Sequence, residues 1–142
     1  MKENIVCSGA LFYATGTKRF LFLQRTDKKT QGMWGLVGGK SKFSESAFEG
    51  LKREVEEEVG DTPKFKKVIP LEMFTSNDQK FYFHTYLIAV ENEFIPKLNI
   101  EHSGYCWCAF ECWPKNLHMG LKNTLNNKSI KGKLQTILDL IV

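Results

Sequence analysis

The sequence predicts an α/β domain, because segments typical of β-strands occur together with two segments of helical periodicity. The chain has 142 residues, of which 42% are apolar. This size suits one hydrophobic core and leaves no room for a second full domain. No internal repeat or low-complexity tract interrupts the pattern. We therefore treat residues 1–142 as a single domain.

The chain opens on a predicted β-hairpin. Residues 5–13 are mostly apolar or small, as in a buried strand, and residues 20–24 are apolar in the same way. Residues 15–18 separate the two strands and include Gly16, a residue type common in tight turns. Residues 25–32 are polar and mostly basic, which indicates a loop after the second strand.

A glycine pair precedes the first predicted helix. Residues 34–37 form a short apolar stretch, and Gly38 and Gly39 then allow backbone conformations that side chains would forbid. Ser44 is a good N-cap residue and Gly60 suits the C′ position, so a helix is predicted between them. Its apolar residues recur at helical spacing: Ala47, Phe48, Leu51, Val55 and Val59.

Three strands and a second helix complete the prediction. Residues 68–75 and 81–90 are two of the strands, joined by a polar turn at 76–78, and residues 105–110 form a shorter one. Residues 130–142 carry apolar side chains at helical spacing, which predicts an amphipathic helix that closes the core.

Charge and cysteine content exclude several classes of protein. Lys and Arg total 20 and Asp and Glu total 16, a formal charge of +4 that suits an anionic ligand without demanding nucleic acid.

The apolar runs are far shorter than the roughly 20 residues of a membrane helix, so no membrane span is expected. Residues 1–4 lead into the first strand without a signal-peptide pattern, and four cysteines are too few for a secreted disulfide scaffold. The expected location is the cytoplasm.

The charged residues within 53–58 destabilise the helix that contains them. Like charges at i, i+4 and anions in the last helical turn each cost up to about 1 kcal/mol. Glu54, Glu57 and Glu58 share one helical face, whereas Glu56 points elsewhere. One interpretation is a solvated acidic face with lysine partners. The other is a cation site, because Mg²⁺ and Mn²⁺ prefer carboxylate oxygens and a cation offsets the repulsion.

The spacing around this run resembles the signature of the Nudix (MutT-like) hydrolase family. Residues 39–61 follow the Nudix box, G-x5-E-x7-R-E-U-x-E-E-x-G-U, where U is a bulky apolar residue, and Asp61 at the final U is the one departure. The matching fixed positions are Gly39, Glu45, Arg53, Glu54, Glu57, Glu58 and Gly60. Residues 34–39 and 101–107 are similar to the W-x-L-P-G-G and E-H-x-x-Y-x-W segments of family members, with Val37 in place of proline.

This resemblance implies a fold and an activity. Nudix domains are α/β/α sandwiches with a mixed β-sheet, and the box forms a loop, a helix and a loop at the sheet edge. Family members are pyrophosphohydrolases that cleave a nucleoside diphosphate linked to another group, by attack of water and with Mg²⁺ or Mn²⁺ bound. The acidic run agrees, because diphosphate hydrolysis needs neutralised oxyanion charge and an activated water.

Residue roles in the family carry over to the matching positions of this sequence. The expected metal ligands are three carboxylates and one backbone carbonyl: Glu54, Glu57, Glu58 and Gly38. Arg53 is expected to orient Glu45 or Glu54 by a bidentate contact that lysine cannot reproduce. The general base is expected to be Glu57 or Glu101, and Glu101 is equally well explained as a surface residue on a loop.

Three residues are predicted to contact a substrate: Arg25, Trp34 and Tyr82. Arg25 belongs to the basic loop, which suits either the guidance of a polyphosphate or ordinary solvation. The Trp34 ring suits stacking on a base, and Tyr82 lies in a strand whose neighbouring side chains point to both sheet faces. Trp107 is expected in the core. A zinc site is disfavoured, because C-x-C-x3-C is an uncommon spacing for structural zinc in the set Cys106, Cys108, Cys112, His102 and His118.

The expected substrate is a nucleoside triphosphate, a dinucleoside polyphosphate or a nucleotide sugar. The proline and the tyrosine that mark two branches of the family beyond the box are replaced by Ser76 and Asp78. The alternative is a catalytically silent Nudix-fold module that binds a nucleotide or RNA. Apart from this alternative, the only nucleic acid expected as a partner is a capped-RNA substrate. The sequence is compatible with a monomer or a homodimer.

Overall fold

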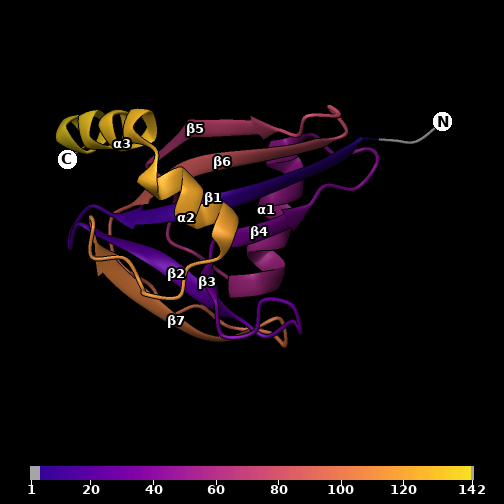
Figure 1. Ribbon diagram of the computed structural model, residues 1–142. Coiled ribbons are helices and arrows are strands. Elements are labelled where there is room, and N and C mark those ends of the chain that lie inside the picture. Colours follow the sequence, from indigo (N-terminus) through magenta and orange to yellow (C-terminus); the bar gives the residue numbers. More distant parts are fainter. Residues whose placement is uncertain (1–3, 142) are drawn as a thin grey trace.

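The computed structural model of the protein describes residues 4–141 and contains one mixed β-sheet with helices on both faces (Figure 1). The strands are β1 (Ile5–Ala14), β2 (Arg19–Arg25), β3 (Trp34–Gly35), β4 (Val37–Lys40), β5 (Lys67–Thr75), β6 (Phe81–Val90) and β7 (His102–Ala109). The helices are α1 (Ala47–Val59), α2 (Met119–Asn126) and α3 (Lys128–Leu140). Helix α1 covers one face of the sheet, and α2 and α3 lie on the other. The α/β/α sandwich is therefore confirmed.

The sheet is organised around β1. Its strand order is β3-β2-β1-β6-β5, with β4 paired to β1 and β7 paired to β2. Strands β1 and β6 run parallel, from Ile5 opposite Phe81 to Ala14 opposite Val90, whereas the other pairs are antiparallel. On its other side β1 pairs first with β4 and then, at its end, with β2, as the predicted hairpin requires. Among the described strands β4 pairs with β1 alone, so it leaves an edge of the sheet beside α1.

Helix α1 begins at a capping box. The Ser46 hydroxyl accepts a hydrogen bond from the Glu49 amide at 3.1 Å, and the Glu49 carboxylate accepts one from the Ser46 amide at 2.9 Å. The predicted N-cap at Ser44 is wrong, because Ser46 and not Ser44 has a glutamate three residues later to complete the box. The predicted end of the helix is confirmed at Gly60, whose φ of 75° favours a residue without a Cβ.

Two apolar layers hold the sandwich together. The first lies between the sheet and α1 and includes Phe12 and Leu51, and the second lies under α2 and α3 and includes Phe22 and Leu134. Full burial of a Leu or Phe side chain stabilises a fold by about 1.5–3 kcal/mol. Trp107 packs against the first layer, so its expected place in the core is confirmed.

Two elements of the second half differ from the prediction. Strand β7 begins at His102, earlier than the predicted Tyr105, because its pairing with β2 continues to the end of that strand. Helix α2 was not predicted. Its 8 residues provide too few turns for an apolar period to stand out, although Leu121 and Leu125 bury themselves at i, i+4.

Helix α3 packs on the second layer, which confirms the predicted closing helix. It begins at Lys128 and not at Ile130, because the Asn127 side chain caps it by accepting from the amides of Ser129 and Ile130 at 2.9 and 3.2 Å. The predicted end of this helix, Val142, lies outside the described residues. So do residues 1–3, which entered the prediction of location.

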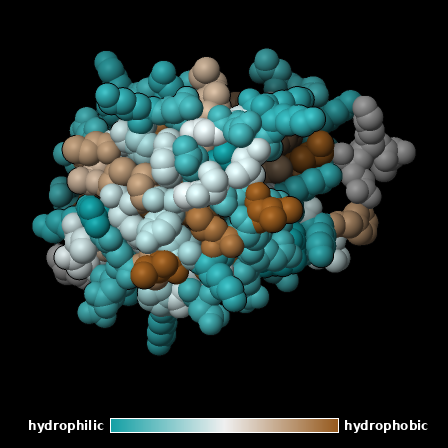
Figure 2. Space-filling model, turned by 90° about the horizontal axis from the view of Figure 1, so that it is seen from below, coloured by the Kyte–Doolittle hydropathy of each residue, from teal (hydrophilic) through white to brown (hydrophobic). Residues whose placement is uncertain are grey.

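Helix length and surface hydropathy bear on association with a membrane. Within residues 4–141, every helix is too short or too polar to cross a bilayer. Figure 2 shows one face of the molecule as largely hydrophilic, with apolar side chains at a few separate places. That face therefore presents no broad apolar surface.

Candidate active site

Two adjacent glycines let β4 approach both β1 and helix α1. Gly38 has a φ of 154°, and a Cβ at this position would overlap the Ser8 carbonyl oxygen of β1. Gly39 faces α1, and a Cβ there would lie 2.5 Å from Oε2 of Glu54. A side chain at either position therefore has to displace β1 or the Glu54 carboxylate. The glycine pair thus brings a carboxylate of the box against bare backbone.

Glu58 is a buried acid at the same place. Its residue exposure is 2%, and its Oε1 accepts a hydrogen bond from the Gly38 amide at 3.0 Å. Burial is the main cause that raises the pKa of Glu58 to about 9, and the neighbouring carboxylates of Glu54 and Glu101 contribute to this rise against the opposing effect of the Gly38 amide. We refer to Glu54, Glu58 and Glu101 as the acidic cluster. A buried carboxyl held beside two other carboxylates is a strong candidate for a functional group.

Arg53 joins the beginning of the box to the middle of its helix. Its Nε and Nη2 donate to the two carboxylate oxygens of Glu45 at 2.8 and 3.0 Å, and Nη1 donates to Glu54 at 2.7 Å. Nη2 also donates to the Lys40 carbonyl at 3.0 Å. The predicted bidentate contact is thus made with Glu45, and Glu54 is contacted at the same time. Hydrogen bonds from Arg53 lower the pKa of Glu45 to about 2, so that carboxylate stays charged.

Glu57 shares Nη1 of Arg53 with Glu54 but is outside the group of Glu58, Glu101 and His102. Its side chain is 53% exposed, and both carboxylate oxygens lie 3.3 Å from Nη1 of Arg53. The three box glutamates therefore have different environments, although helical spacing places them on one face. Glu58 is buried and Glu54 is largely covered, whereas Glu57 reaches solvent.

Glu101 is brought to the cluster by the loop that precedes β7. The Asn99 side chain bridges this loop to α1, because its Nδ2 donates to the Glu57 carbonyl at 2.8 Å while its Oδ1 accepts from the Glu101 amide at 2.9 Å. Thr26, just after β2, also binds the loop before β7. Its amide donates to the Glu101 carbonyl, and its hydroxyl donates to the Ile100 carbonyl. Glu101 is therefore an exposed loop residue, as the second interpretation expects, whose backbone is held in place beside Glu58. The sequence analysis missed Asn99 and Thr26.

His102 is a further residue of the site that the sequence analysis did not assign to it. It is 8% exposed, and one of its ring nitrogens lies in a group with carboxylate oxygens of Glu58 and Glu101, all within 4.8 Å of one another. Burial, together with the positive charge of Arg25, lowers the pKa of His102 to about 4. The imidazole is therefore neutral near pH 7. His102 is the histidine of the segment E-H-x-x-Y-x-W, but its position beside Glu58 and Glu101 is visible only in the fold.

The donor set of this site fits a divalent cation. Carboxylate oxygens of Glu58 and Glu101 and a neutral imidazole converge within one group among the described residues. Mutual repulsion and burial make the metal-free cluster unfavourable, as the raised pKa of Glu58 records. The residues present are therefore suited to hold a metal ion.

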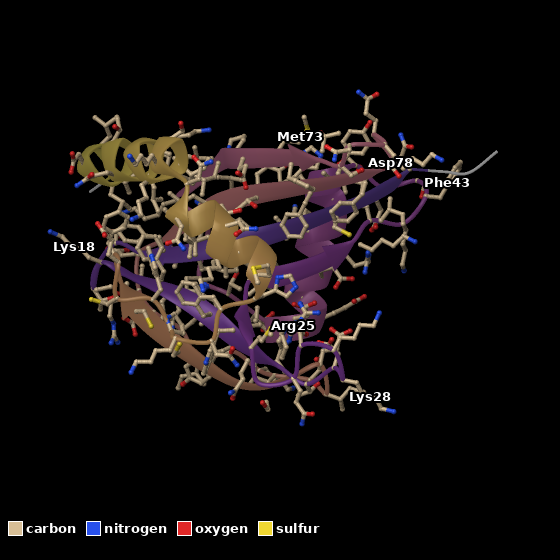
Figure 3. The ribbon with its side chains drawn as sticks, viewed as in Figure 1. Lys18, Arg25, Lys28, Phe43, Met73 and Asp78 are labelled. Carbon is tan, nitrogen blue, oxygen red and sulfur yellow. The ribbon has the colours of Figure 1, made fainter. Side chains whose placement is uncertain are left out.

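The three predicted substrate-contacting residues lie in different places. Arg25 pairs with His102 across β2 and β7, and its Nε donates to Asp27 at 3.0 Å and to Thr30 at 2.6 Å. Figure 3 shows Arg25, the last residue of β2, against the ribbon, and Lys28 of the following loop at the periphery, so Arg25 lies outside the loop to which the sequence analysis assigned it. Trp34 packs on the layer under α2 and α3, on the face opposite α1. Tyr82 lies near the start of β6, opposite Val6 and Thr75 of its neighbouring strands.

The cysteines do not take part in a metal-binding group within residues 4–141. Cys106 and Cys108 project from the same face of β7, as strand alternation predicts, with their sulfurs 3.6 Å apart. Burial raises the pKa of Cys106 to about 12, which disfavours the thiolate that zinc needs. The structure places His102 with carboxylates instead.

The comparisons with solved structures agree with this fold. A MutT NUDIX hydrolase from Burkholderia pseudomallei has 22% identity and a TM-score of 0.67, with 89% of this chain and 99% of the other covered. A C. elegans Ap4A hydrolase, solved as a binary complex, has 20% identity and a TM-score of 0.71, with 95% and 99% covered. The Nudix hydrolase RenU from M. smegmatis has 14% identity and a TM-score of 0.75, with 100% and 90% covered. At these identities the likeness establishes the fold.

Family membership rests on the sequence itself. A search of curated proteins returned no significant match. The profile of the NUDIX domain, in contrast, matches residues 5–127, which is most of the chain and includes the acidic cluster. Members of this family are pyrophosphohydrolases that act on acid anhydrides. The chain therefore belongs to the NUDIX domain family and is a Nudix hydrolase.

Proposed function

We propose that this protein hydrolyses a nucleoside diphosphate linked to another moiety, in a reaction that requires Mg²⁺ or Mn²⁺. The observation that carries the proposal is the acidic cluster, in which the buried Glu58 lies beside Glu54 and Glu101 and is bound by the amide of Gly38. A buried cluster of this kind is destabilising without a cation. A bound cation would offset this cost, which is why the cluster supports a metal-dependent reaction.

The metal ligands in this proposal are the ones that the box implies. Glu54, Glu57 and Glu58 would hold the metal together with the carbonyl of Gly38, which lies next to the amide that contacts Glu58. The bound metal supplies neutralisation of charge on the phosphate oxygens and a more acidic water. Arg53 keeps Glu54 in place by its hydrogen bond at 2.7 Å, and Glu45 holds Arg53 in turn.

A base on the protein takes the proton from the attacking water. Glu57 is one candidate, because its carboxylate reaches solvent beside the cluster. Glu101 is the other, because the bonds of Asn99 and Thr26 place it next to Glu58. A general base contributes about 10²–10⁴-fold to a rate, so loss of the true base is easily measured.

The proposed substrates are nucleoside triphosphates, dinucleoside polyphosphates and nucleotide sugars. The similarity to a structure described as an Ap4A hydrolase supports inclusion of dinucleoside polyphosphates. Arg25 at the end of β2 and the exposed Lys28 and Lys29 on the β2–β3 loop form a basic approach that suits polyphosphate guidance. Trp34 and Tyr82 are proposed substrate contacts. The location is proposed to be the cytoplasm.

The test is release of phosphate or nucleotide from a panel of these substrates, ADP-ribose and capped RNA, with Mg²⁺, with Mn²⁺ and with EDTA. We expect cleavage of one class that EDTA abolishes. Glu57→Gln and Glu101→Gln are compared with Glu56→Gln, which changes an exposed residue of the same helix. The base variant should lose about 10²-fold or more of kcat. Binding of nucleotide and metal without cleavage of any substrate would favour the silent binding module.

A further inference from the structure

One buried polar atom near the acidic cluster has no role in the hydrolysis described above. Nδ1 of His102 is inaccessible to solvent and has no hydrogen-bond partner among residues 4–141. Buried polar atoms in folded proteins are paired in the great majority of cases, because an unpaired one costs about 1–3 kcal/mol. One ring nitrogen of His102 also lies in a group with carboxylate oxygens of Glu58 and Glu101, and the unpaired Nδ1 together with this group indicates a ligand.

The surroundings of His102 hold it in position for that ligand. It is the first residue of β7 and lies opposite Arg25 of β2 in the sheet register. Its own amide donates to the Asn99 carbonyl at 3.3 Å, so the residue that anchors Glu101 also anchors His102. The imidazole and the Glu101 carboxylate are thus presented by one short, braced segment.

The distances suit a metal ion. Ligand atoms of Glu58, Glu101 and His102 lie within 4.8 Å of one another. Bonds of about 2.0–2.2 Å at a tetrahedral angle place ligand atoms about 3.3–3.6 Å apart, so the group has to contract by up to about 1.5 Å. Glu101 is exposed and its side chain is free to supply that movement, whereas Glu58 and His102 are buried.

We propose that Glu58, Glu101 and His102 form a mixed oxygen and nitrogen site that binds a divalent transition metal such as Zn²⁺ in preference to Mg²⁺. Imidazole is a ligand that suits transition metals, whereas Mg²⁺ favours oxygen donors and gives up its water reluctantly. This inference deepens the proposed function, because Glu58 belongs to both ligand sets. It adds His102 as a ligand.

The same assignment separates the two candidates for the general base. Once the Glu101 carboxylate is bound to a metal together with His102, it is no longer free to take a proton from water. Glu57, which is 53% exposed and outside this group, is then the base, and Glu57 leaves the set of metal ligands, whose box members are then Glu54, Glu58 and the Gly38 carbonyl. Glu101→Gln should therefore weaken metal affinity, and Glu57→Gln should lower turnover while the transition metal still binds at the His102 site.

The experiment is a titration of the full, metal-free chain with Zn²⁺ alone, followed by NMR of the imidazole nitrogens. The chain has three histidines, so the signals are assigned with His84→Gln and His118→Gln variants. We expect the first equivalent of Zn²⁺ to shift a ring nitrogen of His102 and leave His84 unchanged. Metal binding that leaves both ring nitrogens of His102 unshifted would overturn the proposal, and this result needs no substituted His102.

Calorimetry with separate metals gives the second readout. We expect His102→Gln to weaken Zn²⁺ binding by at least about tenfold, which is the lower end of the cost of losing even an outer partner of a ligand. Mg²⁺ binding should change by less than about threefold, because the oxygen ligands remain. His84→Gln is the matched control and should leave both affinities unchanged. Equal losses for Zn²⁺ and Mg²⁺ would contradict selectivity at His102.

These outcomes are distinct from those of the hydrolysis test, since neither readout uses a nucleotide. Cleavage of a substrate with Mg²⁺ together with an unshifted His102 would leave the proposed function standing and remove only this inference. A Zn²⁺-induced shift of a His102 ring nitrogen in a chain that cleaves no substrate of the panel would support this inference and contradict the proposed function.

Discussion

Substitution of Glu58 by glutamine tests the electrostatics of the site in the metal-free chain. Burial raises the pKa of Glu58 to about 9 in the folded state, whereas the ordinary value of the unfolded chain is 4.5. Between these two values the folded state binds a proton that the unfolded state has lost. The free energy of unfolding therefore falls as the pH rises through this range.

The magnitude follows from the proton balance. The contribution of this one group falls by at most about 1.4 kcal/mol for each pH unit. For a domain of this size, that slope corresponds to a decrease in Tm of about 4 °C per pH unit. The amide of Glu58→Gln stays neutral, so the variant should lack this slope, while a Glu56→Gln control should keep it.

The assay is thermal unfolding in EDTA between pH 5 and 9 for the wild type and both variants. The difference in Tm between wild type and Glu58→Gln should change steadily with pH. Addition of Mg²⁺ or Mn²⁺ should reduce the wild-type slope, because a cation stabilises the charged carboxylate. Parallel profiles for wild type and Glu58→Gln would refute the raised pKa and with it the electrostatic argument for the cluster.

Three other substitutions test how the site is held. Arg53→Lys loses the bidentate fork, so kcat should fall about 10–100-fold with little change in unfolding by urea; an unchanged kcat would contradict the positioning role. Asn99→Ala should cost about 1–2 kcal/mol from two lost hydrogen bonds, weaken metal binding and speed amide exchange in the loop before β7. Gly39→Ala should push Glu54 aside and cost about 1–3 kcal/mol in urea unfolding. Gly132→Ala, with open space around it on α3, is its control and should stabilise by about 0.5–1 kcal/mol.

The sequence alone predicted the fold class, most of the longer strands and helices, and the charged residues of the box. Strand alternation and helical periodicity are local properties, and they predicted the hairpin, β5, β6, α1 and the closing helix. The charged residues of the box lie within one helix and the loop before it. Their spacing carried the resemblance to the family, the resemblance implied the sandwich fold, and the family match over residues 5–127 confirms the family. The resemblance also implied that Arg53 orients Glu45 or Glu54, and its hydrogen bonds reach both carboxylates.

Tertiary structure decided how the members of the site differ. Helical spacing gives Glu54, Glu57 and Glu58 one face, but only packing against β4 buries Glu58 and leaves Glu57 in solvent. The contact of Glu58 with Glu101 and His102 joins segments far apart in the chain. It depends on the register of β7 on β2 and on the Asn99 bridge, neither of which leaves a periodic signal in the sequence. Sequence spacing thus identified the carboxylates of the box. The pairing of strands in three dimensions determined that Glu58 and Glu101 lie near His102.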